Sequence, residues 1–211
     1  MVPITPDLRP DDPVVEVLVV CTGNIARSPF GEALLQREAS CRLGPDAAVW
    51  VRSAGVNAVV GGAATEQAQR EARARGLDLS AHRGRLVDPD EVRRADLVIT
   101  MSERQRADIV RSVPEALRFV FTLRELARIV DAMRRLEDQL PLRPHVRLVA
   151  RVASGAKPYV ARPREPEDVR DPYRRGDEVY ADVCTQIERH IRGIAPVLFP
   201  SHVRMEDPWT P

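Results

Sequence analysis

The chain has 211 residues, of which 44% are hydrophobic and 30% are charged, and its formal net charge at pH 7 is +1. This length and composition are typical of one globular domain with a substantial core. A net charge so close to zero gives no general reason to expect a nucleic acid or an anionic membrane as partner. No apolar run approaches the roughly 18 residues that span a bilayer, so we expect no membrane segment.

The first half of the chain alternates short apolar runs with helical patterns. Residues 14–20 are nearly all apolar and β-branched, which predicts a strand covered on both faces. Pro29 then stands where the first turn of a helix tolerates proline. Further strands are predicted at 47–51, 95–100 and 118–122, and a polar helix at 65–76 that ends at Gly76. Two capping boxes mark helix starts, Ser102 with Gln105 and Thr122 with Glu125.

The second half is less regular. We predict a helix over 126–140, a short helix over 146–154, an exposed loop rich in proline and charge, and a last helix over 177–194. Strands that alternate with helices predict an α/β fold with a parallel sheet. The domain boundaries that we expect are a flexible tail at 1–13, one domain at 14–198 and a C-terminal tail at 199–211.

The three cysteines, Cys21, Cys41 and Cys184, form no CxxC pair. Their spacing argues against a disulfide framework and against structural zinc. The opening segment MVPITPDLRPDDP has prolines and acidic residues where a signal peptide needs an apolar stretch. We therefore expect a cytoplasmic protein.

Cys21 ends the first predicted strand and opens the string CTGNIARSP, with Arg27 six positions later. That spacing alone has little weight, because Lys157 is the only lysine and 31 of the 32 basic residues are arginine. The context carries more: a strand precedes the string, a helix follows it, and Gly23 and Asn24 stand where left-handed turns are easiest.

Such a loop can bind an anion. Backbone N–H groups that gather before a helix N-terminus form a nest for a phosphate group, and Arg27 can add a bidentate contact. The same positive field favours the thiolate of Cys21. We therefore predict a nucleophile and a phosphate site in one place. The predicted phosphate-binding residues are Thr22, Gly23, Asn24, Ile25, Ala26, Arg27 and Ser28. A buried structural cysteine, or a nucleotide-binding turn without a nucleophile, would be the simpler interpretations.

The string resembles the active-site loop of the low-molecular-weight protein tyrosine phosphatases. The resemblance extends to VRSAGV (51–56), LDLSAHRGR (77–85), ADLVITMS (95–102) and DPY (171–173), and it does not cover 127–167. It implies a four-stranded parallel sheet flanked by helices on both faces, with an extended helical and loop insertion at about 127–167 before the general-acid loop. It also implies an enzyme with no metal and no other cofactor.

The resemblance implies a role for each matching residue. Cys21 corresponds to the nucleophile, Arg27 to the phosphate-clamping arginine and Asp171 to the general acid. Ser28 corresponds to the hydroxyl that steadies the thiolate. The residues that correspond to the loop braces are Asn24, Ser28, Ser53 and His82. The substrate wall would be formed by Val59, Val60 and Tyr173. Asp168 and Glu167 remain open as alternative positions for the acid.

The implied function is a metal-independent phosphomonoesterase that acts through a phosphocysteine on a phosphotyrosine protein or a small phosphomonoester. Some positions depart from the family pattern. Ala26 stands where many relatives have a second cysteine, Val59 or Val60 replaces an aromatic residue, and Arg174 replaces a second tyrosine. Stacking on phosphotyrosine is therefore expected to be weaker than in relatives.

Two other functions remain open. Arsenate reductases share this loop and fold, but the thiol-relay kind needs resolving cysteines, and residues 77–92 contain none. A non-catalytic phosphate-binding regulator could use the same scaffold, although Cys21, Arg27 and Asp171 are all present. The sequence does not indicate an oligomeric state.

Overall fold

The computed structural model describes residues 14–137, 146–161, 163–164 and 166–200. The predicted N-terminal tail, 1–13, and residues 201–211 of the predicted C-terminal tail, 199–211, lie outside these residues. Phe199, which we assigned to the C-terminal tail, belongs to the core instead, because its side chain is buried against the last helix and its neighbours. Within the described residues, no helix has the length and apolar character needed to cross a membrane.

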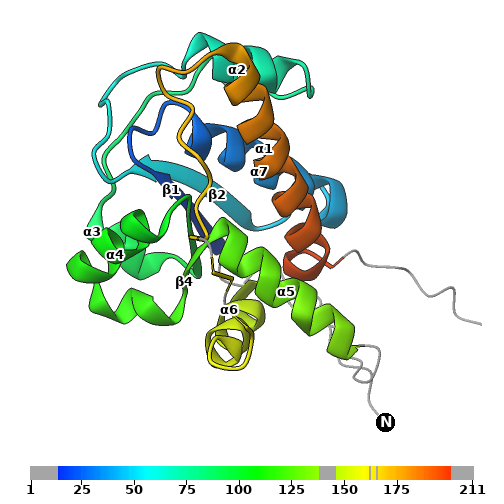
Figure 1. Ribbon diagram of the computed structural model, residues 1–211. Helices are drawn as coiled ribbons and strands as arrows, with labels where there is room; N and C mark the ends of the chain where they lie inside the picture. The colour runs from blue at the N-terminus through cyan, green and yellow to red at the C-terminus, as the bar shows by residue number, and fades with distance from the viewer. Residues whose placement is uncertain (1–13, 138–145, 162, 165, 201–211) are drawn as a thin grey trace, which may run out of the picture.

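Four parallel strands form a single sheet in the order β2-β1-β3-β4 (Figure 1). The strands are β1 (Val15–Cys21), β2 (Val49–Gly55), β3 (Leu97–Thr100) and β4 (Val120–Thr122). The predicted four-stranded parallel α/β fold is confirmed. The register places Cys21 beside Gly55, so the candidate nucleophile lies at the carboxyl edge of the sheet.

The helices are α1 (Arg27–Leu43), α2 (Glu66–Arg73), α3 (Pro89–Arg94), α4 (Glu103–Ser112), α5 (Leu123–Glu137), α6 (Val146–Ala156) and α7 (Asp177–Leu198). A 3-10 helix, η1 (Pro114–Arg118), follows α4. The sequence patterns did not predict α3 or η1. The last helix runs four residues beyond its predicted end and includes Pro196.

Both faces of the sheet are covered, as the apolar character of β1 predicted. Val17 and Val19 point into a core shared with α1, α5, α6 and α7. Leu18 and Val20 point into a smaller core with residues of α3, α4 and η1. Figure 1 shows α3 and α4 on one side of the sheet and α1, α5 and α7 on the other. Because helices cover both faces, the loops that follow the strands meet at the carboxyl edge of the sheet.

Candidate active site

The loop between β1 and α1 has the predicted arrangement. The chain leaves β1 at Cys21, passes Asn24 in a left-handed conformation (φ 54°), and enters α1 at Arg27. The thiol of Cys21 is buried, and its Sγ lies 3.0 Å from the Ser28 hydroxyl. The structure therefore places the predicted nucleophile, its hydroxyl partner and the arginine together.

The backbone of this loop offers unused donors. Within the described part of the chain, no acceptor receives a hydrogen bond from the N–H groups of residues 22–28. Buried or half-buried N–H groups ordinarily find a partner. A row of such groups before a helix is the arrangement that binds an anion. This geometry supports the predicted phosphate cradle.

The four predicted brace residues contact one another around Asn24, whose side chain is fully buried. Asn24 Nδ2 donates to the Oγ atoms of Ser28 (2.9 Å) and Ser53 (2.8 Å). Asn24 Oδ1 accepts from the Arg85 backbone N–H at 2.9 Å. His82 Nε2 lies 2.7 Å from the Asn24 carbonyl oxygen. The left-handed turn is therefore fixed from three segments of the chain.

Three further supporting residues were not predicted. Gln105 Nε2 donates to the Thr22 hydroxyl at 3.0 Å, although its sequence signal indicated only a helix cap. The Ser53 hydroxyl donates to the Glu32 carboxylate on α1. A Cβ on Gly55 would lie inside van der Waals contact of the Thr22 carbonyl oxygen, so the loop approaches β2 more closely than any side chain allows.

The guanidinium of Arg27 is nearly buried, at 5% exposed. Nη1 donates to the Val169 carbonyl oxygen at 3.0 Å, and Nη2 donates to Asp171 Oδ2 at 2.6 Å. Nε is buried and has no partner among the described residues. Nε and Nη2 share one edge of the guanidinium, and this edge can hold two oxygens of a phosphate.

Asp171 is the predicted acid that the structure brings to the loop. Its side chain is half exposed, and Oδ1 accepts from the Tyr173 backbone N–H at 3.1 Å. The alternative carboxylates are held elsewhere. Asp168 Oδ1 accepts from the first N–H of α4, that of Glu103, at 2.8 Å. Glu167 is buried in an ion pair with an arginine of α5.

A cavity of about 210 Å³ opens above the loop. Its lining residues are Cys21, Thr22, Gly23, Ile25, Ala26, Arg27, Asn57, Val59, Asp171 and Tyr173. Two of the three predicted wall residues, Val59 and Tyr173, therefore line it. Val60 is not among the lining residues, and its side chain is 73% exposed. Ile25 and Asn57 complete the walls, which the sequence did not indicate.

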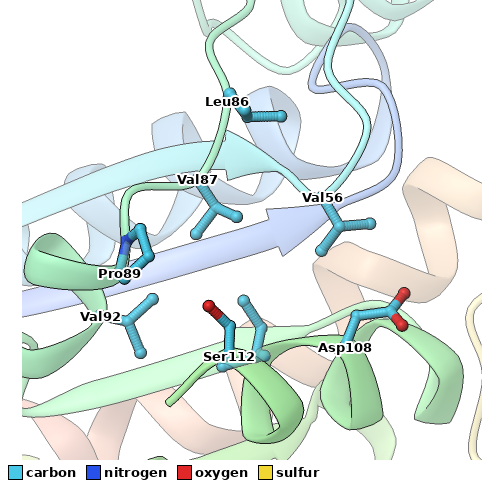
Figure 2. Close-up of a pocket in the computed structure, with 8 residues that line it drawn as sticks. Val56, Leu86, Val87, Pro89, Val92, Asp108 and Ser112 are labelled. Atoms are coloured by element: carbon cyan, nitrogen blue, oxygen red, sulfur yellow. The ribbon is translucent and has the colours of Figure 1, made fainter.

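A second hollow of similar volume lies on the side of the sheet that α3 and α4 cover, between helix α4 and the segment that leads into α3 (Figure 2). Its lining residues are Val56, Leu86, Val87, Pro89, Val92, Asp108, Ile109 and Ser112. They include no thiol, imidazole or guanidinium. This hollow therefore has no thiol to attack a phosphate group and no cationic side chain to bind one.

The other two thiols are not part of the cavity. Cys41 is exposed in the last turn of α1. Cys184 is buried on α7, and burial raises the pKa of its thiol to about 12. No group of three His, Cys, Asp or Glu side chains suited to a metal ion occurs among the residues that the structure describes.

Comparisons with known proteins agree with this geometry. The family model described as low molecular weight phosphotyrosine protein phosphatase matches residues 16–142. The protein-tyrosine-phosphatase Ptp of Acinetobacter johnsonii is 34% identical over 107 residues, which are 51% of this chain and 70% of the relative. The low molecular weight protein tyrosine phosphatase of T. tengcongensis superposes with a TM-score of 0.62 at 25% identity, over 85% of this chain and 97% of that one. The YwlE arginine phosphatase of Geobacillus stearothermophilus gives a TM-score of 0.62 at 26% identity, over 86% and 90%.

The fold and the site together define a cysteine-dependent phosphatase. The match over residues 16–142 covers more than half of the chain and includes the whole cysteine loop. The chain belongs to the low molecular weight phosphotyrosine protein phosphatase family.

Proposed function

We propose that this phosphatase hydrolyses phosphotyrosine through a phosphocysteine formed on Cys21. One observation carries the proposal: Cys21 and Arg27 line the same small cavity, and the Nε of Arg27 has no hydrogen-bond partner among the described residues. A phosphoryl group held by Arg27 and the loop N–H groups would have its phosphorus within reach of the sulfur. Fixed donors aimed at the equatorial oxygens supply most of the catalysis in phosphoryl transfer.

The ion pair between Arg27 and Asp171 suggests an order of events. A phosphate dianion that takes the Nε and Nη2 edge of Arg27 competes with Asp171 Oδ2 for Nη2. The displaced carboxyl group then faces the leaving oxygen. Substrate binding thus fills the cradle and frees the Asp171 carboxylate, which takes up a proton from solvent before it acts as the acid.

The chemical steps balance with the groups present. The Cys21 thiolate attacks phosphorus, the S–P bond forms, and the P–O bond to tyrosine breaks as Asp171 gives its proton to the leaving oxygen. Water then attacks phosphorus, the S–P bond breaks, and the water proton goes to the Asp171 carboxylate. The Ser28 hydroxyl, 3.0 Å from Sγ, can donate a hydrogen bond to the thiolate as it leaves.

The cavity walls favour an aromatic ester. Ile25, Val59 and Tyr173 offer apolar surface to a ring, whereas a phosphoarginine would need a carboxylate beside its guanidinium. Among the described residues that line the cavity, Asp171 is the acidic one, and the proposed mechanism uses it as the proton donor. The relative from Acinetobacter johnsonii is named a tyrosine phosphatase, while the YwlE neighbour is named an arginine phosphatase. We favour tyrosine on the basis of the walls.

The test uses two peptides of one sequence, carrying phosphotyrosine or phosphoarginine at the same position. We expect faster release of phosphate from the phosphotyrosine peptide, with Cys21→Ser as the blank because a serine hydroxyl is hardly ionised at neutral pH. Faster turnover of phosphoarginine would overturn the substrate assignment. Substantial activity in Cys21→Ser would overturn the phosphocysteine route.

A further inference from the structure

The loop that carries Asp171 also carries three exposed arginines, Arg170, Arg174 and Arg175. Within the described part of the chain, none of these three guanidinium groups has an ion pair or a side-chain hydrogen bond. Acidic neighbours on the loop are already paired: Asp171 contacts Arg27, and Asp177 contacts Arg70. Glu178 is the exposed carboxylate that follows them. This loop borders the cavity through Asp171 and Tyr173 and forms the rim on that side, and the rim carries an excess of positive charge.

Arg174 holds a defined position on this rim. Its φ is 59°, a left-handed conformation that residues with a Cβ rarely adopt. The turn is closed by a hydrogen bond from the Arg175 N–H to the Pro172 carbonyl oxygen at 2.9 Å. The guanidinium carbon of Arg174 lies 5.3 Å from the centroid of the Tyr173 ring, within cation–π distance. Because Tyr173 lines the cavity, the charge of Arg174 stands next to the wall that a substrate passes.

We propose that Arg174 makes the enzyme prefer phosphotyrosine that is flanked by acidic residues. The inference rests on the proposed function, since it concerns the same site. Residues next to phosphotyrosine in an extended peptide lie about 3.5 Å apart along the chain. Their carboxylates can therefore come within the screening distance of a rim charge, which is about 8 Å at physiological ionic strength.

The expected effect is modest, because Arg174 is exposed. Exposed ion pairs change an equilibrium by about 1.5- to 5-fold each, and salt weakens them. A ratio between two matched substrates reveals an effect of this size better than a single rate does. It also cancels any change that the substitution makes to the catalytic steps common to both substrates.

The experiment compares two phosphotyrosine peptides of equal length, one with glutamate and one with lysine on both sides of the phosphotyrosine. For the wild type we expect a larger kcat/KM on the glutamate peptide, through a lower KM, and a preference that shrinks as salt is added. Arg174→Gln keeps the side-chain stem and removes the charge, so it should lower the preference by about 1.5- to 5-fold per carboxylate contacted. Arg174→Lys should retain most of the preference.

The control variant is Arg151→Gln, an exposed arginine of α6 that does not line the cavity. It should leave the preference as in the wild type. Hydrolysis of p-nitrophenyl phosphate by each variant shows that the protein is folded. Equal kcat/KM values on the two peptides, or a preference that Arg174→Gln leaves unchanged, would refute the role of Arg174 while Cys21-dependent hydrolysis still stood. Absence of Cys21-dependent hydrolysis of both peptides would refute the proposed function as well.

Discussion

Arg27 and Asp171 lie 144 positions apart in the sequence, yet their side chains meet at 2.6 Å. The contact brings the phosphate-binding group and the proposed acid to one cavity before any substrate arrives. The buried Nε of Arg27 has no partner among the described residues, which leaves one edge of the guanidinium to be completed by an anion. Asp171 is half exposed, so displacing it does not require unfolding of the loop.

Replacement of Asp171 tests its role as acid. Asp171→Asn should lower kcat/KM, which reports formation of the phosphocysteine, by about 10²–10⁴-fold on phenyl phosphate, the usual contribution of general acid catalysis. The loss on p-nitrophenyl phosphate should be much smaller, because a good leaving group departs without protonation. Asp168→Asn is the matched control, since Asp168 caps α4. Equal losses on both esters for Asp171→Asn, or a steeper dependence for Asp168→Asn, would show that the acid is placed wrongly.

Gly55 limits how closely the cysteine loop can approach β2. In Gly55→Ala, the new Cβ must displace the Thr22 carbonyl oxygen and press on Asn24. We expect the free energy of unfolding to fall by about 1–3 kcal/mol, as in other overpacked sites. A small displacement of the cradle should also lower kcat/KM by about 10- to 100-fold.

The control for this change is Gly193→Ala on α7, where a new Cβ has no neighbour within 4 Å. A glycine inside a helix costs roughly 0.5–1 kcal/mol relative to alanine, so this variant should be slightly more stable and fully active. Urea unfolding and hydrolysis of p-nitrophenyl phosphate measure both effects. Full activity in Gly55→Ala would mean that the loop does not need its close approach to β2.

Helix α7 packs against both α1 and α5 and contains a half-buried histidine, His190. Burial, with the charges of Arg189 and Arg124, lowers the pKa of His190 to about 4. Its Nε2 has no hydrogen-bond partner among the described residues. In the unfolded chain, the histidine binds a proton near its ordinary value of about 6.5. Between these two values the unfolded state holds more protons, so the free energy of unfolding falls as the pH decreases.

This linkage gives a prediction for α7. Going from pH 7 to a pH of about 4, the wild type should lose about 1–3 kcal/mol more unfolding free energy than His190→Gln does. Urea unfolding of both proteins at the two pH values measures the difference, and the other titrating groups cancel between them. Equal losses in both proteins would mean that His190 is not held neutral by burial.

Local patterns were enough to predict most elements. The apolar runs of β1 and β3 and the capping residues Ser102 and Thr122 are signals that need no distant contact. Helix α3 has only six residues, too few to show a repeating apolar pattern. Its start does carry a local signal, because Asp88 caps the helix and Pro89 stands in its first turn. The insertion at about 127–167 remains a prediction. The family match extends to residue 142, into the first part of this segment.

The sequence predicted the site residues that follow one another along the chain, but it missed contacts between residues that are far apart in the sequence. Residues 21–28 form one continuous string, so their chemistry can be read from their order. The contacts of Gln105 with Thr22 and of Glu32 with Ser53 join segments that only the folded sheet brings together. Val59 and Val60 were equivalent in the sequence, and only the loop conformation turns Val59 toward the cavity.

At the scale of the whole molecule, the parallel sheet gathers the cysteine loop, the brace segments and the Asp171 loop at one edge. The account of that edge depends on a covalent bond between Cys21 and phosphorus. Asp171→Asn should slow hydrolysis of that intermediate, because the variant lacks the base for the attacking water. The intermediate should therefore accumulate during turnover of p-nitrophenyl phosphate.

The most direct measurement is mass spectrometry of Asp171→Asn after acid quenching during turnover of p-nitrophenyl phosphate. We predict that the peptide containing Cys21 gains the mass of one HPO₃, and that Cys21→Ala in the same background shows no turnover-dependent gain. Two results would contradict the phosphocysteine mechanism. One is phosphate on another residue, and the other is steady turnover with no phosphorylated peptide although hydrolysis of the intermediate limits the rate.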